Sequence, residues 1–165
     1  MNNSYQMLEN NLNREITLYE ELSILYEEKR KLLINNVPEE LESVDTKVIN
    51  KSQEIKTAIE ERLRIISEIK RTTDCLSDII QECAKTDQAQ ADVLEEKRTQ
   101  INRIVKKLQK QDKTNIELTK HGLKFSNKIM QIILNAAIAA NAEYDKTGKA
   151  ITQNDMQMSS ISKEA

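Results

Sequence analysis

Glycine and proline, the residues that most often form turns, are nearly absent from this chain of 165 residues. Gly122, Gly148 and Pro38 are the only three. A sandwich, barrel or α/β fold of this length would need many turns, and turns depend heavily on both residue types. Glu, Lys, Leu, Ile, Gln, Asn and Ala dominate instead, and they favour long helices and coiled coils. The sequence therefore predicts an all-α fold.

The balance of apolar and charged residues limits how thick the core of such a fold can be. Aromatic residues make up 3% of the chain, charged residues 32% and hydrophobic residues 38%. That ratio is typical of helices with one narrow apolar stripe and a broad solvated face. We therefore expect an elongated antiparallel hairpin or coiled-coil bundle of three long helices, stabilised by helix-on-helix packing along its length.

The first helix is predicted over about residues 4–35, where apolar residues recur at spacings of three and four. The segment Asn35–Glu40 then breaks this pattern. Asparagine tolerates the left-handed conformation that ends helices, and Pro38 can begin the next one because its missing N–H is not needed there. A connection this short predicts that the first two helices fold back as an antiparallel hairpin.

The second helix is predicted over residues 38–84, with the apolar repeat of a coiled coil. It is either continuous or broken near Thr72, where Thr72-Thr73-Asp74 could cap a short connecting helix over Cys75–Ala84. A third long helix follows over residues 89–142, with Thr86 or Asp87 as its N-cap. Its apolar stripe turns polar in the middle, at Gln111, Asp112, Asn115 and Thr119.

The end of the third helix, Ile129–Ala142, is apolar nearly all round. A two- or three-helix rod cannot bury every side of such a segment. A homodimer contact, an end-cap on the bundle and a partner-binding surface are all open interpretations. We place the helical bundle over residues 1–142. Residues 143–165 are polar and too poor in apolar residues to fold alone, so we expect a disordered tail.

Several function classes are disfavoured. A net charge of −2 is unlike that of a nucleic-acid binder, and the lysines and arginines from Lys97 to Lys113 are best explained as a solvated helix face. The apolar stretch at the end of the third helix is shorter than the roughly 20 residues of a membrane span, and no signal peptide is recognisable. Cys75 and Cys83 are too far apart on one helix to form a disulfide. Free thiols are typical of a reducing compartment, so we expect the protein in the cytoplasm.

No enzyme chemistry is recognisable either. The single histidine, His121, has no Cys, Asp or Glu cluster at metal-ligand spacing, and two distant glycines cannot form a phosphate-binding loop. Neither cysteine has a companion histidine in a recognisable arrangement. Adjacent glutamates such as Glu60-Glu61 are explained by a solvated helix face. We therefore expect no catalysis, no cofactor and no metal, and a protein that works by binding other proteins.

The order of these elements resembles the FlgN family of flagellar export chaperones. The leucines around Glu28-Lys29 are similar to the first-helix pattern of that family, and Ile59-Glu60-Glu61-Arg62-Leu63 is similar to its second helix. The long third helix with a polar middle and an apolar end is also similar. Finally, Tyr144-Asp-Lys-Thr-Gly148 resembles a Tyr-x-x-x-Gly element after the last helix of the family.

The resemblance implies a cytoplasmic chaperone that binds the amphipathic terminal helices of hook–filament junction proteins, keeps them from associating and delivers them to the flagellar type III export gate. Tyr144, near Gly148, would then help docking at that gate; a ring that merely caps the bundle end is the other interpretation. The predicted substrate-binding residues are those at the apolar end of the third helix: Leu118, Phe125, Ile129, Ile132, Ile133 and Ala136.

Two other classes of function remain as alternatives. One is a structural coiled-coil scaffold or self-assembling rod with no chaperone role, and the other is a helical nucleic-acid adaptor that uses the lysines from Lys97 to Lys113. The sequence leaves open the oligomeric state, the junction protein that is bound, the continuity of the second and third helices, and whether the tail orders on a partner.

Overall fold

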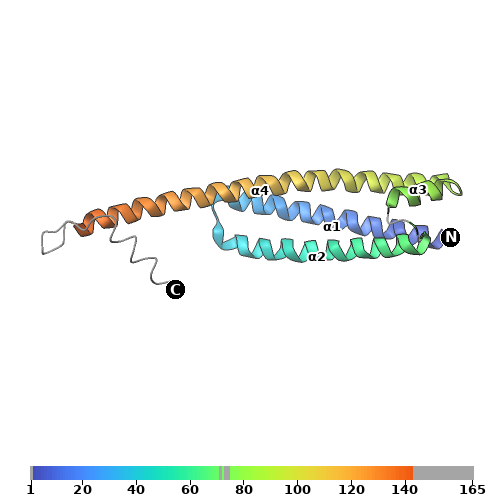
Figure 1. The fold of residues 1–165 in the computed structure, drawn as a ribbon, viewed down its shortest axis with the longest axis horizontal. Helices are drawn as coiled ribbons and strands as arrows, with labels where there is room; N and C mark the ends of the chain where they lie inside the picture. The colour runs from blue at the N-terminus through green and yellow to red at the C-terminus, as the bar shows by residue number, and fades with distance from the viewer. Residues whose placement is uncertain (1, 71, 73–74, 143–165) are drawn as a thin grey trace. The chain divides into compact units, whose positions relative to one another are not determined.

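The structure of the chain is a computed structural model that describes residues 2–70, 72 and 75–142, with side chains from residue 3 to residue 135 of that range. The described residues form α1 (Asn2–Asn35), α2 (Pro38–Ile69), α3 (Leu76–Ala84) and α4 (Gln88–Ala142) (Figure 1). This part of the chain contains no strand, so the all-α prediction is confirmed. The tail predicted over residues 143–165 lies outside the described residues.

The connection between α1 and α2 forms as the sequence predicts. Asn36 adopts a positive φ of 54°, the left-handed conformation that ends a helix. The N–H of Val37 donates to the carbonyl of Leu32 at 3.1 Å, which closes the last turn of α1. Pro38 then opens α2, with Glu39 and Glu40 in its first turn, where the helix dipole favours negative charge.

Helices α1 and α2 pack against each other along their lengths as an antiparallel hairpin (Figure 1). Ion pairs of 3.0 Å or less join Arg14 to Glu61, Glu21 to Lys51 and Lys29 to Asp45. As the residue numbers on α1 rise, the residue numbers of their partners on α2 fall, as expected for two antiparallel helices. The hairpin prediction is therefore confirmed.

The second predicted helix is broken, as the alternative with a short connecting helix anticipated. Helix α2 ends at Ile69 and α3 begins at Leu76. The N-cap of α3 is Cys75, and no side-chain hydrogen bond closes that cap. Of the three residues expected to cap this helix, Thr73 and Asp74 lie outside the described residues.

Helix α4 begins one residue earlier than predicted, and Asp87 is the residue that caps it. Its carboxylate accepts a hydrogen bond from the N–H of Gln90 at 3.0 Å, the usual geometry of an aspartate N-cap. Farther along, side chains of α4 bond to α1 in rising order on both helices: Gln90 to Glu9, Gln111 to Ser23 and Asn115 to Tyr26. Helix α4 therefore runs parallel to α1 over this range.

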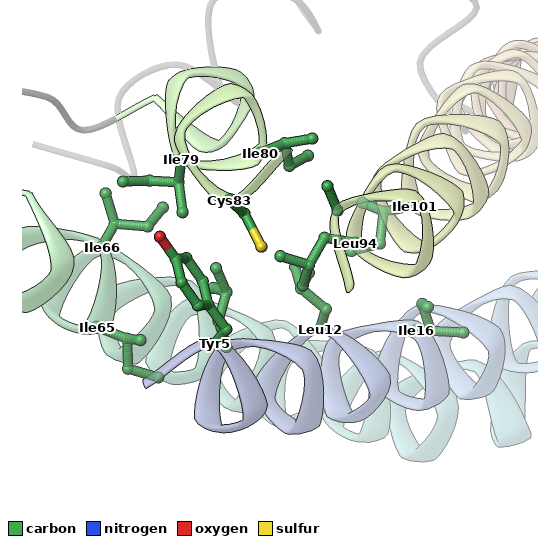
Figure 2. Packing of buried hydrophobic residues seen from close by; sticks show 12 residues of the cluster. Tyr5, Leu12, Ile16, Ile65, Ile66, Ile79, Ile80, Cys83, Leu94 and Ile101 are labelled. Carbon is green, nitrogen blue, oxygen red and sulfur yellow. The ribbon is translucent and has the colours of Figure 1, made fainter. Parts of the chain in front are cut away.

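The core of residues 1–120 consists of two clusters of buried apolar side chains. Figure 2 shows the larger one, in which Cys83 and its neighbours on α3 point between α1, α2 and α4. Its members are Tyr5, Leu8, Leu12, Ile16, Ile65, Ile66, Ile79, Ile80, Cys83, Ala91, Leu94 and Ile101. The smaller cluster joins Leu18 and Leu22 of α1 to residues of α2 and to Leu108 of α4. All four helices therefore contribute to the larger cluster, and α1, α2 and α4 to the smaller one.

The chain divides into two compact units, one over residues 1–120 and one that begins at His121. The division falls within α4, so the first part of that helix belongs to the four-helix unit and the rest to the second unit. The described helices include none with the length and apolar character needed to cross a membrane.

Candidate partner-binding surface

Within the first unit, α4 contributes a regular apolar stripe to the core. Leu94 is fully buried, and Ile101 and Leu108 are 7% exposed. The steps of seven between these residues match two turns of a helix, so they lie on one face. This part of α4 belongs to the two buried clusters, together with residues of α1, α2 and α3.

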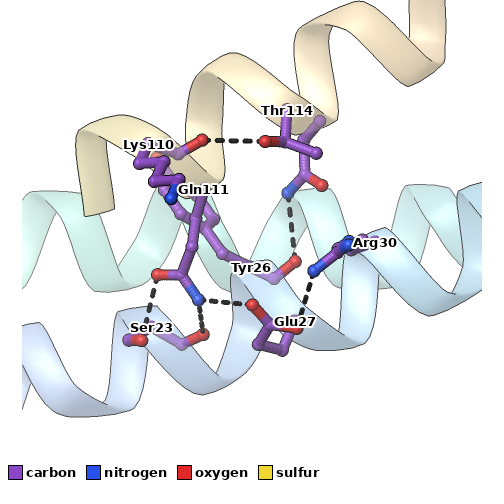
Figure 3. Close-up of polar contacts among 8 residues, drawn as sticks. Ser23, Tyr26, Glu27, Arg30, Lys110, Gln111 and Thr114 are labelled. Atoms are coloured by element: carbon purple, nitrogen blue, oxygen red, sulfur yellow. Dashed lines mark hydrogen bonds and ion pairs between the residues drawn. The ribbon is translucent and has the colours of Figure 1, made fainter. Parts of the chain in front are cut away.

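After Leu108 the buried face of α4 becomes polar, as the sequence predicts for this region. Gln111 is buried, and its side-chain amide donates to the carbonyl of Ser23 at 3.2 Å and to the carboxylate of Glu27 at 2.8 Å. The hydroxyl of Ser23 donates back to Gln111 Oε1 at 3.0 Å. Figure 3 shows these three bonds linking α4 to α1. All polar atoms of the Gln111 side chain are thus satisfied within the protein.

Asn115, one turn later, is 3% exposed and donates from Nδ2 to the carbonyl of Tyr26 at 3.0 Å. Its Oδ1 is buried and has no hydrogen-bond partner within the described part of the chain. A buried acceptor without a partner costs free energy. Buried amides of this kind commonly select one pairing and register of helices at some cost in stability. Gln111 and Asn115 therefore bond α4 to α1 at buried positions, and we expect them to favour this pairing.

A second buried polar contact, which the sequence did not point to, joins α1 to α2. Glu15 is fully buried, and its carboxylate pairs with the guanidinium of Arg62 at 2.8 Å. Burial raises the pKa of Glu15, and the charge of Arg62 opposes that rise. The pair lies in the packed core of the hairpin, and the described residues hold no cluster of His, Cys, Asp or Glu that could bind a metal ion. The pair joins α1 to α2, and we expect it to favour this pairing of the two helices.

The second unit differs sharply from the first in exposure. Every residue from 121 to 135 is exposed. Among the residues predicted to bind substrate, Phe125 is 66% exposed, Ile132 60% and Ile133 56%, and Ile129 is also exposed. We call the apolar side chains of residues 121–135 the exposed apolar surface. An apolar surface of this kind is typical of a site for a partner protein.

Two of the predicted binding residues stand apart from that group. Leu118 is half-buried and belongs to the first unit, while the side chain of Ala136 lies outside the described residues. Tyr144 and Gly148, predicted to dock at the export gate, also lie outside them.

Three further residues of the exposed apolar surface were not among the predicted binding residues: Leu123, Met130 and Leu134, each more than half exposed. They follow a second stripe of the helix, at steps of seven and four. The sequence did carry a signal for them, because the end of α4 is apolar nearly all round. The predicted binding residues all lie on the first stripe.

The polar side of this segment carries positive charge without negative charge. Lys124 and Lys128 are exposed, and the sequence has no aspartate or glutamate from residue 118 to residue 142. His121 is exposed as well. The segment can therefore offer a partner apolar contacts and ammonium groups, and its described side chains include no carboxylate.

Comparison with known proteins adds one match. The family model described as FlgN protein matches residues 1–152, which include all four helices. This confirms the family predicted from the order of the sequence elements. The search of curated proteins found no match, and the search of solved structures found none.

Proposed function

This chain belongs to the FlgN family, a family of flagellar export chaperones, and on that premise we propose that it binds amphipathic terminal helices of hook–filament junction proteins. In this proposal it acts in the cytoplasm, keeps those helices from associating before export and delivers them to the flagellar export apparatus. The proposal leaves no role for catalysis, a cofactor or nucleic acid.

The observation that carries the proposal is the exposed apolar surface of α4. Phe125, Ile129, Ile132 and Ile133 place large apolar side chains in solvent, where each loses the free energy that burial would provide, about 1.5–3 kcal/mol for a fully buried side chain. A partner helix with its own apolar stripe would recover that free energy by packing against them. The same packing would cover the stripe through which the partner self-associates.

The most direct test places charge on the exposed apolar surface. We expect the double substitution Ile129→Asp and Ile133→Asp to abolish capture of a purified junction protein in a pull-down assay. A matched control is Ile24→Asp with Ile49→Asp, because these isoleucines are 67% and 68% exposed in the first unit. The control should keep capture, and circular dichroism should show similar helicity in both variants. Capture that survives the first change would refute the placement of the binding surface.

The docking role of Tyr144 rests on the Tyr-x-x-x-Gly resemblance alone and has a separate test. We expect Tyr144→Ala to leave the affinity for a junction protein unchanged and to reduce secretion of that protein from cells. A lower affinity in the purified system would instead make Tyr144 part of substrate binding.

The alternative function, a self-assembling rod, is supported by the same exposed apolar surface, because association of several copies of the chain could bury it. Sedimentation separates the two functions. A chaperone should remain a monomer or dimer alone and should sediment faster after a junction protein is added. A rod protein should form larger assemblies without any partner.

A further inference from the structure

The exposed apolar surface is wider than one helix can cover. Phe125, Ile129, Ile132 and Ile133 form one stripe, and the second contains Leu123, Met130 and Leu134. At 3.6 residues per turn these side chains span roughly 200° of the helix circumference. The apolar stripe of an ordinary amphipathic helix is about half as wide. Complete burial of this surface therefore needs two neighbouring helices.

Charge borders one side of that surface. Lys128 is three residues after Phe125 and four before Ile132, so it lies beside the first stripe. Lys124 precedes it by one turn. On the other side, the residue beside Met130 and Leu134 is Asn127, which is neutral. A partner would meet two ammonium groups along one edge and uncharged side chains along the other.

The same segment of a second copy of this chain fits that charge pattern poorly. Its own residues 118–142 carry lysines and no carboxylate, so pairing two copies of this segment would bring like charges together. Like charges across an interface reduce affinity and disfavour the wrong partner. The occupant that complements this surface carries carboxylates.

We propose that residues 121–135 bind two helices of one partner protein, and that the helix beside Lys124 and Lys128 carries aspartate or glutamate along the edge of its apolar stripe. The inference rests on the proposed function and specifies the substrate that this site accepts: an acidic pair of helices. Specificity then comes from the lysine edge and affinity from both apolar stripes.

An anionic membrane surface is the other environment with apolar and negatively charged groups. The polar side of this segment is better suited to a protein partner than to a membrane, because it holds only two lysines beside the neutral Asn127, Gln131 and Asn135. Helices that lie in a membrane interface are usually rich in lysine and arginine on the polar face. Vesicle binding without binding to an acidic helical partner is therefore an outcome that would overturn the proposal.

The charge requirement can be measured with two synthetic helical hairpins. Both have leucines at the apolar heptad positions, and they differ in carrying only glutamate or only lysine beside those positions. We expect the intact chain to bind the glutamate hairpin roughly tenfold more tightly in fluorescence anisotropy, with the difference shrinking as salt is added. The double substitution Lys124→Glu and Lys128→Glu should reverse the preference.

The control for charge is Lys106→Glu with Lys110→Glu. These lysines are exposed in the first unit and four residues apart, like Lys124 and Lys128, so both double substitutions change the net charge by the same amount. It should leave the preference unchanged. Equal binding of the two hairpins, or a preference that follows net charge in the control, would overturn the acidic requirement. Failure of the proposed function is a distinct result, in which the glutamate hairpin binds and the junction proteins do not.

The two-helix requirement is tested on the second stripe. Met130→Ser with Leu134→Ser should weaken binding of the glutamate hairpin at least tenfold, while Ile24→Ser with Ile49→Ser should have no effect. Unchanged affinity in the first variant would mean that one helix covers the site. Vesicles of equal parts phosphatidylcholine and phosphatidylglycerol complete the experiment: binding to them, without binding to the glutamate hairpin, would assign the surface to a membrane.

Discussion

Two parts of α4 both carry apolar side chains at helical spacing, but they have opposite environments. From Leu94 to Leu108 the apolar side chains are buried against α1 and its neighbours, whereas from Leu123 to Leu134 they are exposed. Leucine and isoleucine dominate both stretches, so composition does not explain the difference. The first stretch has apolar partners elsewhere in the chain, and the second has none among the described residues. An apolar helical stripe therefore predicts that a surface will be covered, but does not say by which molecule.

The largest test of this comparison removes the same apolar group from both stretches. Leu94→Ala should lower the free energy of unfolding by about 2–5 kcal/mol, because it leaves a cavity in a fully buried site. Leu134→Ala should change it by no more than about 0.5 kcal/mol, as expected for an exposed position. Urea unfolding followed by helicity measures both. Equal losses would mean that the second stretch is covered within the chain.

A second test uses two glutamines on the same helix. Gln111→Ala should cost about 1–3 kcal/mol, because the hydroxyl and carbonyl of Ser23 lose their buried partner. Gln131→Ala, at an exposed position, should be nearly neutral in the same urea assay. If Gln111→Ala were also neutral, water would be able to replace the amide, and the polar contact would not select α1 as the neighbour of α4.

The dependence of stability on pH should also separate the two parts, since Glu15 lies in the first unit and residues 121–142 contain no carboxylate. Burial raises the folded-state pKa of Glu15 above its usual value of 4.5, against the opposing charge of Arg62. A raised carboxyl pKa favours folding below the unfolded-state value, and this contribution is lost as pH rises through the folded-state value. Lowering the pH from 7 toward 4.5 should therefore stabilise the native chain relative to Glu15→Gln.

The pH effect is measured as the difference in urea-unfolding free energy between the two proteins at each pH, which cancels the titration of other groups. A difference that is constant with pH, or that shrinks as the pH falls, would contradict a raised pKa. Because Arg62 offsets part of the burial effect, we expect this change in unfolding free energy to be smaller than the loss for Leu94→Ala or Gln111→Ala.

The smallest expected effect concerns Gly122, an exposed glycine inside α4. A Cβ at this position would meet nothing within 4 Å beyond its chain neighbours and the adjacent backbone of its own helix. Glycine in a helix interior is less stable than alanine by about 0.5–1 kcal/mol. Gly122→Ala should slow amide hydrogen exchange in the residues around it and leave urea unfolding of the first unit unchanged. Faster exchange would mean that this part of α4 relies on the freedom of glycine, for example to let a partner approach closely.

Much of the local structure follows from the sequence because it depends on neighbours within one or two turns. The spacing of apolar residues predicts the helices, and Asn36, Pro38 and Asp87 mark ends that the structure reproduces within two residues. The break after Ile69 was one of two alternatives, since threonines and an aspartate can cap a helix or lie within it. The exposed residues from Phe125 to Ile133 were predicted as a binding set from the excess of apolar side chains, and their binding role stays a prediction.

What the sequence alone determined is that the chain is helical, where most helices begin and end, and that the end of α4 has more apolar surface than a thin bundle can bury. The short connection also predicted that α1 pairs with α2, but only the tertiary structure decided that α4 lies along α1 and which polar side chains meet between the helices. The bonds from Gln111 to Ser23 and from Arg62 to Glu15 join residues 88 and 47 positions apart. Such pairs leave no periodic trace in either helix, because burial of a polar side chain depends on the neighbour that folding brings to it.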